Sequence, residues 1–179
     1  GKDSLKHFLL YITKEYIIVL KLMKNSSIVI VCGDPKSTFN EILIKTFKNK
    51  IFKNLKFSII IVGSKKLLEN ELKKFKVKIN LQKFEDQANF RKNSVYVADI
   101  PLDTRKLSLT KKNKYISKSF DTGLNFLKKK TSLALINGPI SKTTFLKGTY
   151  YGITEYLAFK TKSLPPNADT IINRVDLGV

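Results

Sequence analysis

Ser141 and Lys142 stand side by side directly after a turn, and both side chains can donate hydrogen bonds to an anionic oxygen. The turn is Asn137-Gly-Pro139, in which glycine permits unusual backbone angles and proline cannot continue a strand ladder. In open α/β sheets, ligands bind at the carboxyl ends of the strands. The pattern predicts a phosphate or carboxylate site at Ser141 and Lys142. The simpler alternative is a strand-loop-helix turn with solvated polar residues.

An apolar run from Leu133 to Ile136 precedes this turn. Four consecutive apolar residues bounded by turn residues are typical of a strand that is covered on both faces. We therefore expect a buried strand here, with the candidate site at its carboxyl end.

Two further polar groups follow predicted strands or begin predicted helices. Asp34 lies in the loop after the apolar run 28–32, where it suits a turn and where a following helix N-terminus would attract anions. This loop has neither the Walker pattern nor G-x-G-x-x-G. Thr154 and Glu155 begin the last periodic segment, and the alternative for both is helix capping.

The apolar patterns alternate between strand and helix along the chain. Strands are expected at 28–32, 57–62, 77–81, 95–100 and 133–136, and helices at 42–47, 65–75, 115–129, 143–146 and 154–160, with loops at 82–94 and 106–114. This alternation predicts an α/β fold with a largely parallel sheet and flanking helices. The expected organisation is a helical extension over 1–22, an α/β domain over 23–162 and an irregular tail or linker over 163–179.

The formal charge of +20 raises the question of a nucleic-acid partner. Only three of the 34 basic residues are arginines, whose planar fork suits base and phosphate recognition, and the lysines are scattered along the chain. We therefore expect only weak, salt-sensitive binding to polyanions and no specific binding to nucleic acid.

Cysteine and histidine are scarce. The single cysteine, Cys32, excludes an internal disulfide and a cysteine zinc site, and the single histidine, His7, lies far from every motif. No apolar run approaches the roughly 20 residues of a membrane span, and the N-terminus lacks a secretory pattern, which favours a cytoplasmic protein.

Three stretches resemble the N-terminal half of the 4-hydroxythreonine-4-phosphate dehydrogenase family of vitamin B6 biosynthesis. The first is Gly33-Asp-Pro35 with Asn40-Glu-Ile42, and the second is Pro101-Leu-Asp103 with the loop and helix that follow it. The third and most specific pairs Asn137-Gly-Pro-Ile-Ser-Lys142 with Gly152-Ile-Thr-Glu-Tyr-Leu157. The resemblance covers about residues 28–160.

The resemblance implies a homodimeric oxidoreductase of pyridoxine biosynthesis with a fold like that of isocitrate and isopropylmalate dehydrogenases, present here incompletely. Such an enzyme oxidises a phosphorylated hydroxyamino acid with NAD or NADP to a 3-keto acid, which then decarboxylates. A divalent cation, Zn, Mg or Co, acts as the Lewis acid. The resemblance also implies that Ser141, Lys142, Thr154, Glu155 and Asp34 contact or border the phosphorylated substrate, whereas it assigns no catalytic residue.

The chain also departs from the family pattern. The histidine of the G-H-T-E motif, a metal ligand by this resemblance, is replaced by Ile153, which cannot bind a metal, and the family's glycine-rich loop corresponds to residues 36–40. The C-terminal half, with the other metal histidines and most cofactor contacts, has no counterpart here. We therefore expect no metal site and an inactive chain by itself, with an exposed apolar face where the missing half packs. The alternative is a non-catalytic basic α/β module that binds phosphorylated metabolites or polyanions.

Overall fold

A computed structural model describes residues 27–49, 52, 54–85 and 90–161. The predicted helical extension at 1–22 and the predicted tail at 163–179 lie outside the described residues. None of the helices in the described part has the length and apolar character that a membrane crossing requires.

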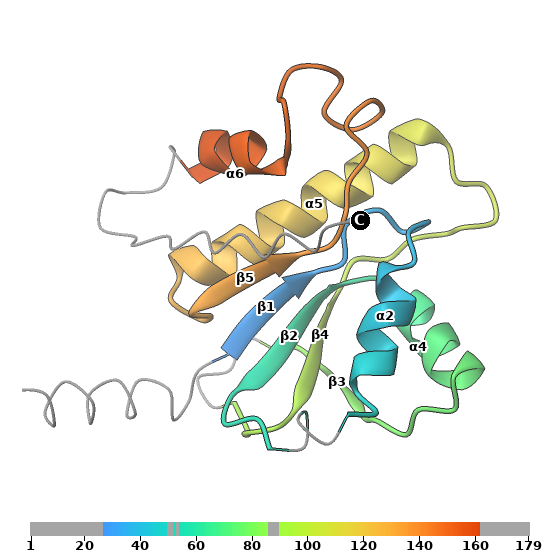
Figure 1. The fold of residues 1–179 in the computed structure, drawn as a ribbon, viewed down its shortest axis with the longest axis vertical. Coiled ribbons are helices and arrows are strands. Elements are labelled where there is room, and N and C mark those ends of the chain that lie inside the picture. The colour runs from blue at the N-terminus through green and yellow to red at the C-terminus, as the bar shows by residue number, and fades with distance from the viewer. Residues whose placement is uncertain (1–26, 50–51, 53, 86–89, 162–179) are drawn as a thin grey trace, which may run out of the picture.

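The described chain forms one parallel sheet of five strands in the order β3-β4-β2-β1-β5 (Figure 1). The strands are β1 (Ser27–Val31), β2 (Ser58–Gly63), β3 (Leu81–Lys83), β4 (Val95–Asp99) and β5 (Ala134–Asn137). All four pairings are parallel, with β1 between β2 and β5. The predicted α/β fold with a largely parallel sheet is therefore confirmed.

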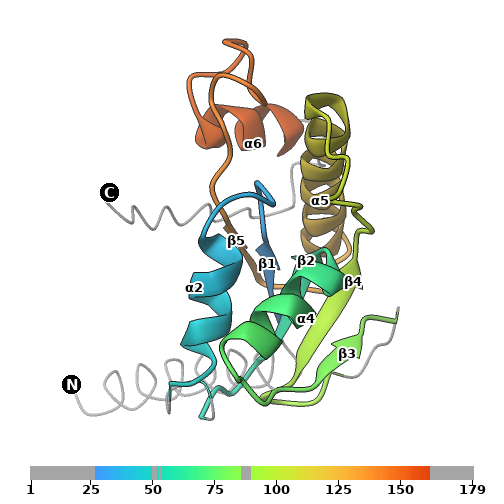
Figure 2. The ribbon, with the colours of Figure 1, turned by 90° about the vertical axis from the view of Figure 1, so that its right-hand side faces the viewer.

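The helices divide between the two faces of the sheet (Figure 2). They are α2 (Phe39–Thr46), α4 (Lys65–Lys74), α5 (Leu109–Lys128) and α6 (Ile153–Thr161). Val29 and Val31 of β1 pack in the cluster that contains α5, whereas Ile30 packs with α2 and α4. This separation follows from the two-residue period of a strand, which sends alternate side chains to opposite faces.

Two predicted boundaries were wrong for local reasons. The third strand is β3, not 77–81, although Val77 and Ile79 do pack against the core from the connection before β3. Helix α5 begins at Leu109 rather than Tyr115, because the Ser108 hydroxyl accepts a hydrogen bond from the Lys111 amide and caps the helix. The polar composition of residues 109–114 concealed that first turn and a half.

The predicted helix at 154–160 is confirmed as α6, but the predicted helix at 143–146 is wrong. Residues 142–145 form turns instead of a helix. The Ser141 carbonyl accepts from both the Phe145 and the Leu146 amides, so the segment makes a single closed turn and does not propagate.

The prediction that the strand at 133–136 is buried on both faces is wrong. In the described sheet β5 is an edge strand, and Leu133 and Ile136 are 58% and 44% exposed. Leu135 packs against the cluster of α5, but Ile136 points to the opposite face, where α2 covers Ile30 on β1 and leaves β5 open. Although the apolar run is uninterrupted, only one face of β5 is covered and the other is open.

A pH-dependent stability is expected from Cys32, which is 1% exposed at the end of β1. Burial raises the pKa of its thiol to about 12, whereas a cysteine thiol in the unfolded chain has a pKa of about 8.5. Above pH ~8.5 the unfolded chain releases a proton that the folded chain retains, so stability should fall by up to about 1.4 kcal/mol per pH unit. Urea unfolding between about pH 8 and pH 10 measures this slope. Cys32→Ala should flatten the dependence of the free energy of unfolding on pH. An unchanged slope in this variant would show that Cys32 is not its cause.

Candidate functional site

The loops after β1 and β5 meet at the carboxyl edge of the sheet. The Asp34 amide donates to the Pro139 carbonyl over 2.8 Å, and the Gly138 amide donates to the Val31 carbonyl over 2.7 Å. Both loops depend on glycine, since a Cβ on Gly33 would lie 2.4 Å from the Pro139 carbonyl oxygen and one on Gly138 would lie 2.2 Å from the Cys32 carbonyl oxygen. The two loops therefore lie against each other at this edge, and glycine permits their close approach.

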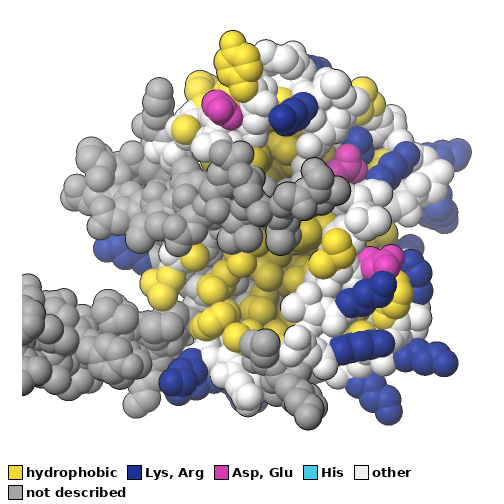
Figure 3. Space-filling view, in the orientation of Figure 1, with side chains coloured by type: hydrophobic (Ala, Val, Ile, Leu, Met, Phe, Trp, Pro, Cys, Tyr) yellow, Lys and Arg dark blue, Asp and Glu magenta, His cyan; other side chains and the backbone are white. Residues whose placement is uncertain are grey.

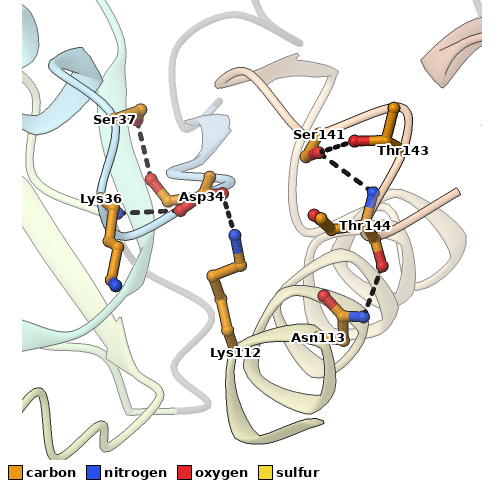
Figure 4. A network of polar contacts seen from close by, with 8 residues as sticks. All are labelled: Asp34, Lys36, Ser37, Lys112, Asn113, Ser141, Thr143 and Thr144. Carbon is orange, nitrogen blue, oxygen red and sulfur yellow. Dashed lines mark hydrogen bonds and ion pairs between the residues drawn. The ribbon is translucent and has the colours of Figure 1, made fainter. Parts of the chain in front are cut away.

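Asp34 is both a turn residue and half of an ion pair. Its Oδ1 accepts from the Lys36 amide over 2.9 Å, and its Oδ2 lies 2.7 Å from Lys112 Nζ at the start of α5 (Figure 4). The Ser37 hydroxyl donates to the Asp34 carbonyl. The side chains of Asp34 and Lys112 are each only 14% exposed, so solvent screens this pair less than a surface pair.

Ser141 organises the second loop. Its Oγ accepts from the Thr144 amide over 3.2 Å and lies 3.2 Å from Thr143 Oγ1. The Thr144 carbonyl in turn accepts from Asn113 Nδ2 over 2.7 Å (Figure 4). Because Ser141 Oγ accepts from the backbone, its own proton is available to Thr143 or to an anion.

Lys142 is exposed next to this turn and has no ion-pair partner among the described residues. Two buried atoms close by, Asn113 Oδ1 and Thr144 Oγ1, have no hydrogen-bond partner within the described part of the chain. Buried polar atoms are nearly always paired in folded proteins. This end of the network therefore suits a water molecule or a polar ligand group.

Thr154 and Glu155 lie apart from the network, exposed on the first turn of α6. No hydrogen bond or ion pair among the described residues connects them to Asp34 or Ser141. Helix α6 is held by Tyr156, whose ring contacts those of Phe120, Phe145 and Tyr150 at centroid distances of 5.3 to 5.7 Å. Figure 2 shows α6 at the end of the molecule that carries the loop after β1.

Sequence reasoning missed Lys112 and Asn113. Residues 106–114 were predicted to be a basic loop, but their second part is the first turn and a half of α5. Ser108 is the signal that could have found them. Serine is a common N-cap residue, and the 14 residues after Ser108 contain neither Gly nor Pro. A helix beginning there puts Lys112 near the carboxyl edge, where the preceding strand ends.

The residues present do not fit the divalent cation that the family resemblance implies. Within the described ranges, no three His, Cys, Asp or Glu side chains lie close enough together to hold a metal ion. The carboxylate of Asp34 is already paired with Lys112, and Ile153 packs against the α5 cluster.

The geometry defines an α/β protein with a parallel sheet and two polar loops that meet at its carboxyl edge. Residues 56–175 match the family model described as "Pyridoxal phosphate biosynthetic protein PdxA". The chain belongs to the PdxA family. A curated relative, 4-hydroxythreonine-4-phosphate dehydrogenase of Sulfurihydrogenibium sp. (strain YO3AOP1), is 32% identical over 133 residues, which are 72% of this chain and 41% of that protein. The chain thus spans about two fifths of that relative's length.

Solved structures show the same fold at low sequence identity. The 4-hydroxythreonine-4-phosphate dehydrogenase from Burkholderia phymatum matches with a TM-score of 0.63 at 20% identity, over 76% of this chain and 44% of that chain. The enzyme of that name from Klebsiella pneumoniae matches with a TM-score of 0.61 at 20% identity, over 76% and 45%. At this identity the likeness concerns the fold alone. It covers less than half of each solved chain, in agreement with the prediction that the fold is present here incompletely.

Proposed function

We propose that this chain provides the substrate-phosphate-binding part of a 4-hydroxythreonine-4-phosphate dehydrogenase. The observation that supports this most is the meeting of the two loops at the carboxyl edge, which presents the exposed Lys142 beside the Ser141 turn. The Lys142 ammonium would bind a phosphate dianion as a point charge, and the hydroxyls of Ser141 and Thr143 would donate to its oxygens. Thr154 and Glu155 on α6 would border the substrate farther from the phosphate.

The complete reaction would need groups that the described residues do not supply. In the full-length enzyme, NAD or NADP would accept a hydride from the substrate hydroxyl carbon, and the resulting 3-keto acid would decarboxylate. This chain's own residues would bind and orient the phosphorylated substrate. The proposal includes the homodimer that the family resemblance implies, and a cytoplasmic location remains a prediction.

An open apolar face over β5 and β1 suggests that another part of the protein packs there. Figure 3 shows hydrophobic side chains gathered over β5 and β1 beside α2. We define the β5 face as Ile28, Phe39, Ala134 and Ile136, of which Ile136 is 44% exposed. Contiguous apolar surface of this kind marks an interface. The portion of the family fold that this chain does not span is the partner that we propose for it.

The alternative function is a non-catalytic basic module that binds phosphorylated metabolites or polyanions. The absence of a fitting metal site among the described residues favours it, as does Ile153 in place of a histidine. Both functions include phosphate binding at Lys142, but only the dehydrogenase requires selectivity for the hydroxyamino acid.

Thermal unfolding of the full chain with 4-hydroxythreonine-4-phosphate tests the proposal. A ligand that binds only the folded state at 100 times its Kd adds about 2.7 kcal/mol of stability. We expect a rise in Tm that Lys142→Ala abolishes, whereas Lys118→Ala, which removes an exposed charge from α5, should preserve it. An equal rise with inorganic phosphate would favour the binding module. No rise with either compound would contradict phosphate binding at Lys142, and salt-sensitive binding to a polyanion would then favour the polyanion form of the module.

A further inference from the structure

Two consecutive residues of α5 hold two different loops of the candidate site. Lys112 forms the 2.7 Å ion pair with Asp34 in the loop after β1, and Asn113 donates over 2.7 Å to the Thr144 carbonyl in the loop after β5. Successive residues of an α-helix point about 100° apart, so neighbouring side chains can reach separate loops. Figure 4 shows both side chains extending from the same turn of α5 toward the two loops.

The turn that carries Lys112 and Asn113 is fixed relative to the sheet. Tyr115 and Ile116, which begin two residues after Asn113, are buried in the core. The Tyr115 hydroxyl also accepts a hydrogen bond from the Ser64 amide over 3.0 Å, at the end of β2. The first turns of α5 therefore form a rigid base from which the two side chains set the positions of the loops.

The ion pair between Lys112 and Asp34 is buried enough to fix the position of the loop after β1. Exposed pairs contribute little because water and salt screen them, but Lys112 and Asp34 are each 14% exposed. Loss of one partner would leave a mostly buried charge without its counterion. The Asp34 amide also donates to the Pro139 carbonyl, so a shift of the first loop would be transmitted to the second.

We infer that Lys112 is a positioning residue, which sets the separation of the two loops through Asp34 and thereby shapes the phosphate-binding turn at Ser141 and Lys142. This inference rests on the proposed function for its ligand, inorganic phosphate or the phosphorylated substrate. The Lys112 ammonium is bound to Asp34 in the first loop, so its proposed action on the phosphate-binding turn is indirect.

Hydrogen exchange of the full chain without ligand tests the first half of the inference. Lys112→Met should accelerate exchange about tenfold at the Asp34 amide and also at the Phe145 and Leu146 amides, which donate to the Ser141 carbonyl. Asp34→Asn should produce the same pattern, and it keeps the shape of the side chain. Lys112→Arg should restore protection, and Lys118→Met should leave it unchanged. Exchange at the wild-type rate at the Phe145 and Leu146 amides of Lys112→Met and Asp34→Asn would overturn the inference.

Affinity for 4-hydroxythreonine-4-phosphate, measured by calorimetry on the same variants, tests the second half. Lys112→Met should bind about tenfold more weakly than wild type, and Lys112→Arg should bind nearly as well as wild type. Equal affinity of Lys112→Met and wild type would overturn the positioning role while the proposed function stands. Failure of the wild type to bind would overturn the ligand half together with the proposed function, and the exchange pattern would still decide whether Lys112 sets the loops.

Discussion

Replacement of Gly33 by alanine should destabilise the chain far more than replacement of Gly148, although the two glycines have nearly the same backbone conformation. Their φ angles are +73° and +71°, a region in which any L side chain costs roughly 1–2 kcal/mol. A Cβ on Gly33 would lie 2.4 Å from the Pro139 carbonyl oxygen, whereas nothing lies within 4 Å of one on Gly148. We expect a loss of about 1 kcal/mol for Gly148→Ala and about 3 kcal/mol or more for Gly33→Ala.

Urea unfolding of the two variants isolates the cost of the close approach, because backbone strain is common to both. Gly138→Ala provides an independent check, since its Cβ would lie 2.2 Å from the Cys32 carbonyl oxygen and 2.8 Å from Phe39 Cδ1. It should match Gly33→Ala in stability and should also abolish the response to the phosphorylated substrate. Equal losses for Gly33→Ala and Gly148→Ala would show that the two loops do not need their tight contact.

The second large effect is expected at the β5 face. Ile136→Lys should weaken self-association of the chain through this face by roughly 100-fold, because it places a charge in a desolvated apolar contact. The substitution should be tolerated in the isolated chain, since Ile136 is 44% exposed on an edge strand and lysine is a common edge residue. The apolar partner surface would lose its contact without loss of the fold.

Sedimentation equilibrium over a range of chain concentrations measures this effect. Tyr151→Lys is the matched control, because Tyr151 is 91% exposed in the loop before α6 and lies outside the β5 face. It adds the same charge and removes a comparable apolar side chain. A wild-type chain that stays monomeric at every concentration would remove the support for self-association. Equal dissociation constants for the two variants would show that the β5 face is not the contact.

Local patterns in the sequence determined the class of fold and the place of the candidate site. Apolar runs followed by Gly or Pro predicted four of the five strands and the turn at Asn137–Pro139. The same patterns placed Ser141 and Lys142 at the carboxyl end of a strand, where ligands bind in open α/β sheets. The motif around Ser141 and Lys142 also resembled the family that residues 56–175 match.

Tertiary structure alone decided which surfaces are open and which side chains meet. The run at Leu133–Ile136 has the composition of a buried strand, yet β5 pairs only with β1 in the described sheet, and Ile136 is 44% exposed. Apolar composition reports the affinity of a segment for a core, whereas burial depends on the neighbours that the topology supplies. The pairing of Lys112 with Asp34 spans 78 positions, so no local spacing could encode it.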